Sequence, residues 1–356
     1  MMFALASTAN IFAQGDKLPP INVKQYKLKN GMTIVMHQDR STPIVSVNMF
    51  YHVGSKNEAK GRTGFAHLFE HMMFQGSVHT GEDVHFKLLR KAGASQINGT
   101  TNSERTNYFE QLPSHQLELA LWLESDRMGY MLPLLNEKSL KNQRDVVRNE
   151  RRQRVDNVPY GRHRLAIAEA LYAPGHPYRY TTIGRHEDIE AASVDDVRAF
   201  FRAWYVPANA TLAIAGDFDT AEARRLVERW FGGFPTSAKP AHEPAAPTPI
   251  SAPVRRVVQD PMAKLRRISY AWHSPANFKP GDAECDLLAQ ILANHKTGRL
   301  HRLLVVEKQL AQSVSAAQQS MGLSGVFQID VTLRPEADLA TVEKILDAEI
   351  ARVLAE

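Results

Sequence analysis

The sequence has few features that would stabilise or localise a protein by means other than a folded core. A single cysteine, Cys285, excludes a disulfide within the chain, and we expect it to be a small buried apolar side chain rather than a nucleophile. Beyond the first residues, no apolar run reaches the length of a membrane span, so no span is expected. The net charge is +5 over 356 residues, of which 44% are hydrophobic. These values are typical of a globular chain, and its length favours two domains.

Positive charge gathers in one segment, residues 144–154, which contains five arginines. Asp145 and Glu150 interrupt this run, and no nucleic-acid recognition motif accompanies it. We therefore expect a helix face that is solvated or ion-paired, and no nucleic-acid partner.

The N-terminal residues are almost wholly apolar from residue 2 to residue 13. This composition resembles the end of a secretory signal peptide that is cleaved after Ala13, although no basic region comes before it. We therefore interpret residues 1–22 as a signal peptide remnant with an N-terminal extension, and we expect a periplasmic or secreted protein. The alternative is a disordered apolar tail on a cytoplasmic protein.

The most specific pattern is His67-Leu-Phe-Glu70-His71, which reads H-x-x-E-H. On a helix, His67 and His71 lie one turn apart on the same face, where two neutral imidazoles can bind one zinc ion. Glu70 lies beside them, close enough to take a proton from a metal-bound water. This order is the reverse of the commoner H-E-x-x-H and marks the inverted zinc peptidases. An amphipathic helix that carries two histidines by chance is the alternative.

A hydrolytic zinc site needs a further protein ligand and keeps one position for water. The segment 143–153 is rich in charged residues, contains no glycine or proline, and is compatible with a helix. Glu150 in this segment is the candidate for the third ligand.

Around Glu150 the sequence reads Val-Val-Arg-Asn-Glu-Arg-Arg, and with this segment the chain resembles the insulinase/pitrilysin family of zinc metallopeptidases. The resemblance covers most of residues 24–334. Its other matching stretches are residues 26–33, 54–58, 64–67, 176–178, 183–184, 204–209 and 215–217. The resemblance implies one zinc ion per chain, held by His67, His71 and Glu150, with Glu70 as the general base.

Two departures from the family pattern concern the third ligand. The interval from His71 to Glu150 is slightly longer than the usual one, and Arg148 stands at the usual position, but arginine cannot bind a cation. Many family members also carry a second carboxylate seven residues before the ligand, where this chain has Gln143. Gln143 can hydrogen-bond a ligand from outside the coordination sphere of the metal, but it adds no negative charge.

The resemblance also implies where substrate binds. Residues 94–102 resemble the family's edge strand, which pairs with the backbone of an extended peptide. Asn98 and Gly99 match its Asn-Ala element and are the candidates for substrate binding. An ordinary turn between two strands is the alternative for these two residues.

A proline-rich stretch at residues 235–254 divides the chain and is expected to be an extended linker. Residues 23–234 then form the catalytic zinc peptidase domain, and residues 255–356 form a second domain. The patterns predict strands at 44–53, within 96–112, and at 210–215, 267–273, 313–316 and 326–333, with helices from 114, at 282–294 and at 336–354. The order restarts after the linker, so we expect an α+β fold with two copies of one domain, each a mostly antiparallel sheet packed with helices.

The second copy is expected to lack a metal site and to be incomplete. Where the first copy has its metal-site residues, the second has Leu288, Ile291 and Leu292, which predict apolar packing. Nothing in it corresponds to residues 135–235 of the first copy. We therefore expect a fragment that resembles the N-terminal half of a long two-half bacterial member, or a chain that pairs with another polypeptide.

The family places an arginine and a tyrosine, seven residues apart, in a noncatalytic domain, where they stabilise the tetrahedral intermediate. The matching positions here are Val305 and Gln312, which cannot act equally well. A C-terminal half or a partner subunit of the same family is therefore an expected partner.

The expected function is zinc-dependent hydrolysis of peptide bonds in peptides or small unfolded proteins. Two alternatives stay open. One is a scaffold subunit that binds no zinc, and the other is a half-enzyme that binds zinc and peptide but needs a partner half to cleave it.

Overall fold

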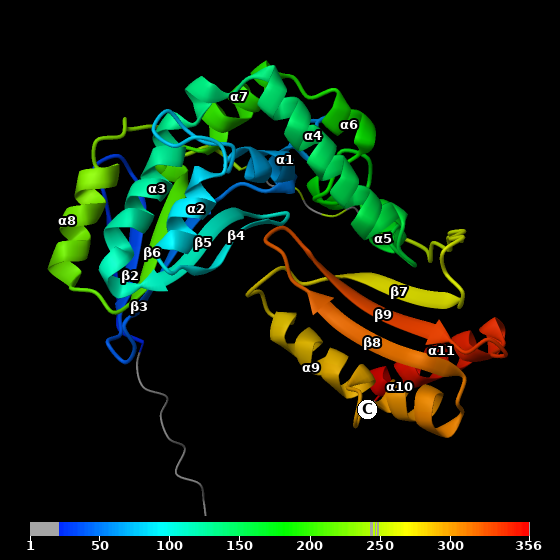
Figure 1. Ribbon diagram of the computed structural model, residues 1–356. Helices are drawn as coiled ribbons and strands as arrows, with labels where there is room; N and C mark the ends of the chain where they lie inside the picture. The colour runs from blue at the N-terminus through cyan, green and yellow to red at the C-terminus, as the bar shows by residue number, and fades with distance from the viewer. Residues whose placement is uncertain (1–20, 243–244, 246, 248, 356) are drawn as a thin grey trace, which may run out of the picture.

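Two sheets of different size divide the chain into two lobes (Figure 1). The computed structural model describes residues 21–242, 245, 247 and 249–355. Among these residues, the lobe that comes first along the chain contains six strands and the second lobe contains three. Most of the expected signal peptide remnant, including Ala13, lies outside the described residues.

The sheet of the first lobe has the strand order β1-β2-β6-β3-β5-β4. Strands β2 and β6 are parallel, and the other described pairs are antiparallel. Alternate residues of β3 are buried, including Val45, Val47 and Met49, because one face of the sheet packs on helices. The strands are β1 (Val23–Lys27), β2 (Thr33–Gln38), β3 (Ile44–Tyr51), β4 (Ser95–Thr101), β5 (Thr106–Pro113) and β6 (Ala210–Gly216).

Helices cover one face and one end of this sheet (Figure 1). Helix α3 packs on β3, β5 and α8, and α1 lies against β4 and β5 with α4 and α7 on its outer side. The helices are α1 (Phe65–Met72), α2 (Val84–Lys91), α3 (Leu117–Tyr130), α4 (Glu137–Arg151), α5 (His163–Leu171), α6 (His186–Glu190), α7 (Val194–Trp204) and α8 (Thr220–Phe231). Helix α4 continues into a π-helical turn, Arg152–Asp156.

The second lobe repeats part of this order around the sheet β7-β9-β8. Strand β9 lies between β7 and β8 as β5 lies between β3 and β4, and both pairings are antiparallel. This arrangement confirms the expected α+β fold with a second, smaller copy. The elements are β7 (Arg267–Ser274), α9 (Asp282–Ala293), α10 (Arg299–His301), a π-helical turn (Arg302–Glu307), β8 (Ala311–Gln319), β9 (Gly325–Leu333) and α11 (Leu339–Ala355).

Helix α9 is the counterpart of α1, and its apolar residues pack only in part. Leu292 is buried and Leu288 packs against the core of the second lobe, as does the half-buried Cys285. Ile291, however, is 52% exposed and Leu287 is 65% exposed. The expectation that Ile291 packs in this core was therefore wrong. The reason is that α9 contacts β8 and α10 on its inner side, and its outer side faces solvent among the described residues.

Polar contacts and a small apolar cluster join the two lobes, where α5 lies over β7 (Figure 1). In the first lobe, the carboxylate of Glu104 accepts hydrogen bonds from Lys56 and from the hydroxyl of Tyr178. Across the interface, the backbone N–H of Gly322 donates to Glu104 at 3.2 Å, and that of Leu323 donates to the Tyr178 hydroxyl at 2.9 Å. Glu104 and Tyr178 therefore anchor the turn between β8 and β9 to the first lobe.

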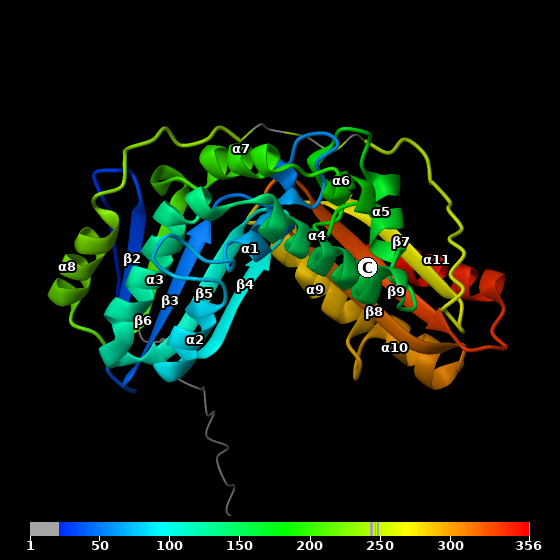
Figure 2. The ribbon, with the colours of Figure 1, turned by 45° about the horizontal axis from the view of Figure 1, so that its top comes forward.

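The described residues that follow α8 run over the outside of the first lobe near α7 (Figure 2). No helix or strand forms in the described residues between α8 and β7. The second part of this segment is held by Tyr160, whose backbone N–H donates to Asp260 at 2.6 Å and whose hydroxyl donates to the Leu265 carbonyl at 2.7 Å. Across the described part of the chain, no helix combines the length and the apolar composition that crossing a membrane requires.

Replacing Tyr178 with Phe removes one hydroxyl, which takes one hydrogen bond from Glu104 and leaves the Leu323 N–H without its acceptor. We expect a loss of unfolding free energy of about 1–3 kcal/mol and faster proteolysis of the segment between the lobes. Chemical denaturation and limited proteolysis measure these effects. Tyr180→Phe, at a neighbouring tyrosine whose ring packs against Arg185, is the matched control. A Tyr178→Phe protein as stable as wild type would contradict this role.

Candidate metal centre

The start of α1 is fixed by two contacts that determine where its side chains point. Gly64 precedes the helix with a left-handed backbone, φ 89°, and the Glu58 carboxylate accepts hydrogen bonds from the N–H groups of Gly64 at 3.0 Å and Ala66 at 2.8 Å. A Cβ added at Gly184 would lie 2.4 Å from the Gly64 nitrogen, so the two glycine backbones are in direct contact. The first turn of α1 is therefore held in one position.

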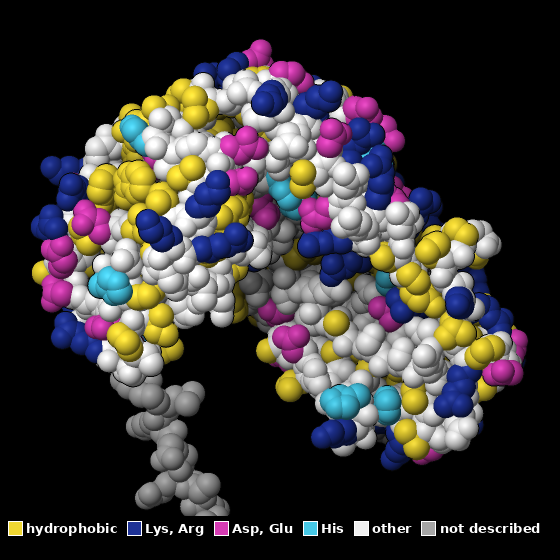
Figure 3. All heavy atoms as spheres, in the orientation of Figure 1, with side chains coloured by type: hydrophobic (Ala, Val, Ile, Leu, Met, Phe, Trp, Pro, Cys, Tyr) yellow, Lys and Arg dark blue, Asp and Glu magenta, His cyan; other side chains and the backbone are white. Residues whose placement is uncertain are grey.

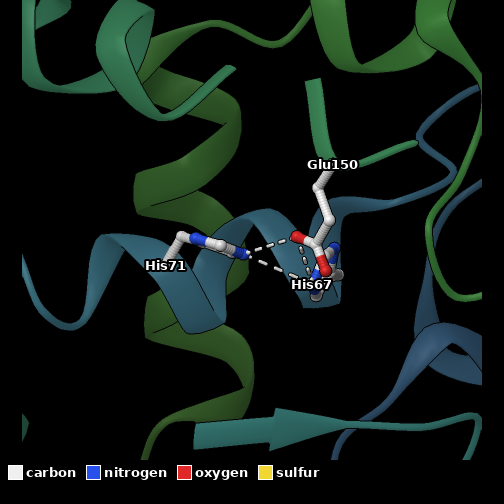
Figure 4. Close-up of side chains that lie close together, drawn as sticks. All are labelled: His67, His71 and Glu150. Carbon is white, nitrogen blue, oxygen red and sulfur yellow. Dashed lines mark hydrogen bonds and ion pairs between the residues drawn. The ribbon is translucent and has the colours of Figure 1, made fainter. Parts of the chain in front are cut away.

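Three side chains from α1 and α4 converge at one point (Figure 4). The Nε2 atoms of His67 and His71 are 3.3 Å apart. The Oε2 atom of Glu150 lies 3.5 Å from Nε2 of His67 and 3.3 Å from Nε2 of His71. The structure thus brings together the three residues that the sequence proposes as metal ligands.

This donor set fits a single zinc ion. A tetrahedral zinc ion with bonds of about 2.1 Å has neighbouring ligand atoms roughly 3.4 Å apart, and the three distances here lie between 3.3 and 3.5 Å. The donors are two imidazole nitrogens and a carboxylate oxygen, all of which bind zinc. With three protein ligands, a fourth position is available to a water or a substrate oxygen.

Electrostatics favour the ligand forms of these groups. Burial is the main cause that lowers the pKa of His67 to about 4, and the neighbouring His71 adds to this effect. The ring of His67 is therefore neutral at pH 7. A hydrogen bond from His71 lowers the pKa of Glu150, against the effect of burial, so its carboxyl is ionised. The side chains are 11%, 24% and 16% exposed for His67, His71 and Glu150, so a small ion can reach them.

Arg154 orients Glu150, the candidate for the third ligand. Arg154 lies one helical turn after Glu150, and its Nη1 is 2.6 Å from Oε1 of Glu150. The other carboxylate oxygen, Oε2, is left directed at the two histidines. The sequence signal for this pair is its i,i+4 spacing, which the arginine-rich run obscures. Other arginines of the run also pair with carboxylates, as in Arg144 with Glu137. The expectation of an ion-paired helix face is confirmed for these residues.

Glu70 points from α1 toward β4. Its Oε2 accepts a hydrogen bond of 2.5 Å from the Thr101 hydroxyl, and a Cβ at Gly99 would lie 3.1 Å from its Cγ. Burial raises the pKa of Glu70, and the hydrogen bond from Thr101 opposes that effect. Thr101 was not identified from the sequence, because which face of β4 meets α1 depends on how the sheet and the helix pack.

Asn98 and Gly99 lie within β4, at the edge of the six-stranded sheet. The alternative that they form an ordinary turn is therefore wrong. Asn98 is exposed and its side-chain oxygen accepts from the Gly99 N–H at 2.9 Å, whereas Gly99 is buried beside Glu70. Gln143 is buried on α4, two turns before Glu150, and its role near the metal stays a prediction.

The space-filling view has a hollow between the two lobes (Figure 3). Figure 3 shows histidine and acidic side chains together at the upper end of this hollow, with Lys and Arg side chains beside them. On the second lobe, Val305 packs partly against the core and Gln312 is exposed. Neither side chain carries the charge that would stabilise a developing oxyanion.

A second group of ionisable side chains is buried between α2, α3 and β5. Arg127 donates two hydrogen bonds to Glu124, and both are enclosed with Glu110 and His85. Burial raises the pKa of Glu110 well above its usual range, and the charge of Glu124 raises it further. Burial lowers the pKa of His85. Such donors could hold a metal, but Arg127 already neutralises Glu124. A proton on Glu110 is therefore sufficient to leave the cluster without net charge.

Two sequence profiles match the chain in succession. The profile described as Insulinase (Peptidase family M16) matches residues 33–180, and the profile described as Peptidase M16 inactive domain matches residues 191–356. The H-x-x-E-H helix and Glu150 both lie inside the first match.

Curated relatives are similar over different shares of their length. The zinc protease PqqE of Helicobacter pylori is 27% identical over 333 residues, which cover 92% of this chain and 73% of that protein. The probable zinc protease PqqL of Haemophilus influenzae is 30% identical over 218 residues, which cover 58% of this chain and 23% of that protein.

Solved structures share the fold. A protease from Helicobacter pylori has a TM-score of 0.82 at 26% identity and covers 93% of this chain and 79% of its own. The periplasmic protease PqqL from Escherichia coli has a TM-score of 0.73 at 20% identity, and the match covers 89% of this chain and 36% of that one.

The buried cluster predicts how stability changes with pH. The pKa of Glu110 is higher in the folded chain than its value of about 4.3 in an unfolded chain. The contribution of Glu110 to the free energy of unfolding is therefore fully present below a pH of about 4.3 and is lost as pH rises toward the folded pKa. Glu110→Gln should therefore become more stable relative to wild type as pH rises from 5 to 9. Thermal unfolding across this range measures the difference, with the exposed Glu82→Gln as control. A difference that does not change with pH would contradict a protonated Glu110.

Proposed function

The chain belongs to the insulinase (M16) family, and on that premise we propose that it is a zinc-dependent peptidase that hydrolyses bonds in peptides or small unfolded proteins. The observation that carries the proposal is the convergence of three donor atoms, 3.3–3.5 Å apart, two of them from the helix that also carries Glu70. One zinc ion per chain would be held by His67, His71 and Glu150.

When bound, zinc supplies Lewis acidity that activates a water and polarises the scissile carbonyl. The residues of the chain supply the proton transfers. Glu70 takes a proton from the attacking water as general base and gives it to the leaving amine as general acid. Glu70 is buried, and the Thr101 hydroxyl of β4 holds one of its carboxylate oxygens at 2.5 Å.

Substrate is proposed to bind as an added strand on β4. This strand ends the sheet, so one of its edges is available for backbone pairing with an extended peptide. Asn98 and Gly99 would contact the substrate where β4 passes Glu70. Gln143 is proposed to hydrogen-bond a metal ligand from α4.

The proposed division of labour follows the two lobes. Residues 23–234 would carry the zinc site, residues 235–254 would link the domains, and residues 255–356 would form the metal-free second domain. The match to the inactive-domain profile supports this role for the second lobe.

A C-terminal half or a partner subunit of the same family is a proposed partner. The outer side of α9 exposes Leu287 and Ile291, which a further domain would cover. The chain spans 36% of the periplasmic PqqL structure from Escherichia coli, which supports a place beside a second half and a periplasmic or secreted location.

The alternative function is a half-enzyme that binds zinc and peptide without turnover. Val305 and Gln312, at the positions where the family pattern has Arg and Tyr, favour it. Cleavage of a mixed quenched-fluorescence peptide library by the purified chain separates the two. Turnover by the chain alone supports the peptidase, whereas stoichiometric zinc and peptide binding without turnover supports the half-enzyme.

Replacing Glu70 with Gln should abolish cleavage of the library with little loss of zinc, because the amide cannot accept the water proton but lies outside the donor set. Peptide assays and metal analysis of the same preparation measure both quantities. The exposed Glu118→Gln on α3 is the control. Full activity of Glu70→Gln would reject Glu70 as the general base.

Replacing Glu150 with Ala should weaken zinc binding by at least about tenfold, because it removes one of three ligands. Zinc content after dialysis against a graded chelator measures the affinity. Glu137→Ala removes an exposed, ion-paired carboxylate from the same helix and should leave the affinity unchanged. Equal zinc retention in the two variants would direct the search to another third ligand.

A further inference from the structure

Two threonines on neighbouring strands connect Glu70 to the sheet. Thr101 of β4 and Thr106 of β5 stand opposite each other in the antiparallel register. The Thr101 Oγ1 atom lies 2.5 Å from Oε2 of Glu70 and 3.3 Å from Oγ1 of Thr106. The Thr106 Oγ1 atom in turn lies 3.0 Å from the carbonyl oxygen of Val53. The carboxylate is thus the last member of a short chain of hydroxyl contacts.

Counting hydrogens decides which acceptor each hydroxyl donates to. Each threonine hydroxyl has one hydrogen to donate. The Val53 carbonyl can only accept, so the buried Thr106 donates to it and has no hydrogen left for Thr101. Thr101 therefore receives nothing from Thr106, and its own hydrogen goes to the closer and charged acceptor, Oε2 of Glu70.

A second contact holds the stem of the same side chain. The Cγ atom of Glu70 lies next to Gly99, where a Cβ would be 3.1 Å away. Gly99 and Thr101 are two residues apart on β4, so they share one face of the strand. One face of β4 therefore holds Glu70 at its stem and at one of its two oxygens.

We propose that Thr101 is a positioning residue, which anchors Oε2 of Glu70 and leaves Oε1 as the oxygen that exchanges a proton with the attacking water. This inference rests on the proposed peptidase function. In the reaction, the water oxygen bonds to the scissile carbonyl carbon while one of its O–H bonds breaks and the proton joins Oε1. That proton then passes to the amine nitrogen as the C–N bond breaks. Thr101 transfers no proton and keeps its hydrogen bond to Oε2 throughout.

The same geometry links the base to substrate binding. Strand β4, which is proposed to pair with the substrate backbone, also carries the Thr101 hydroxyl that holds Glu70. Loss of the Thr101 hydroxyl leaves the backbone of β4 in place, so substrate binding should persist while the proton transfer becomes slower. A kcat effect without a KM effect is the expected signature.

The test compares Thr101→Val, which keeps the shape but not the hydroxyl, with Thr101→Ser, which keeps the hydroxyl. For Thr101→Val we expect kcat to fall by about 10- to 100-fold, with KM and zinc content close to wild type, and for Thr101→Ser we expect most of the rate to return. Thr332→Val removes a strand hydroxyl of the second lobe that accepts from Arg267, and serves as the control for general destabilisation. A Thr101→Val protein with wild-type kcat would overturn the proposal.

A second measurement needs no turnover. In the metal-free protein, the shifts in denaturation midpoint caused by Thr101→Val and Glu70→Ala should not add in the double variant, because both remove the same hydrogen bond. Additive shifts would overturn the proposal, whatever the activity. If the wild-type chain binds zinc but cleaves no peptide, the peptidase function fails, and the midpoints still decide whether Thr101 holds Glu70.

Discussion

The contact between α1 and α4 is the constraint on which the rest of this molecule depends. It brings two imidazole nitrogens and one carboxylate oxygen within 3.5 Å of each other, although Glu150 is far from His67 and His71 in the sequence. Three lone pairs that face one another in a partly buried place repel, unless a cation or proton lies among them. The fold tolerates this arrangement because α7, β4 and β5 hold the remaining sides of α1.

Two clusters of ionisable side chains in the first lobe differ in how far they are exposed and in how their charges are balanced. At the candidate metal centre the ionisable groups keep some exposure, and their lone pairs face one another. Between α2, α3 and β5, Glu110 and Glu124 are enclosed with Arg127, and the charges are balanced within the protein itself. The three side chains of the first cluster are 11–24% exposed, whereas His85, Glu110 and Glu124 are at most 6% exposed, so the two clusters differ in access more than in composition.

The sequence predicts most of what depends on local periodicity. The helical spacing of His67 and His71, the strands on either side of the linker and the restart of the order in the second lobe are all present. Its predictions are weakest where the answer depends on what packs outside an element. Ile291 has the same apolar character as Leu292, yet α9 buries one and exposes the other. Thr101 and Glu58 have no distinguishing pattern of their own, because their partners are set by tertiary contact.

The touching glycines behind α1 have a consequence for how this sequence can vary over time. A methyl group at Gly184 would overlap the backbone of Gly64, and one at Gly64 would approach the carbonyl of Ile183 at 2.9 Å. Both backbones also have positive φ, so neither position accepts a side chain even if the other stays glycine. The two sites cannot compensate for each other. The two glycines therefore form one steric unit, and a side chain at either position would displace the entry to the helix that carries His67 and His71.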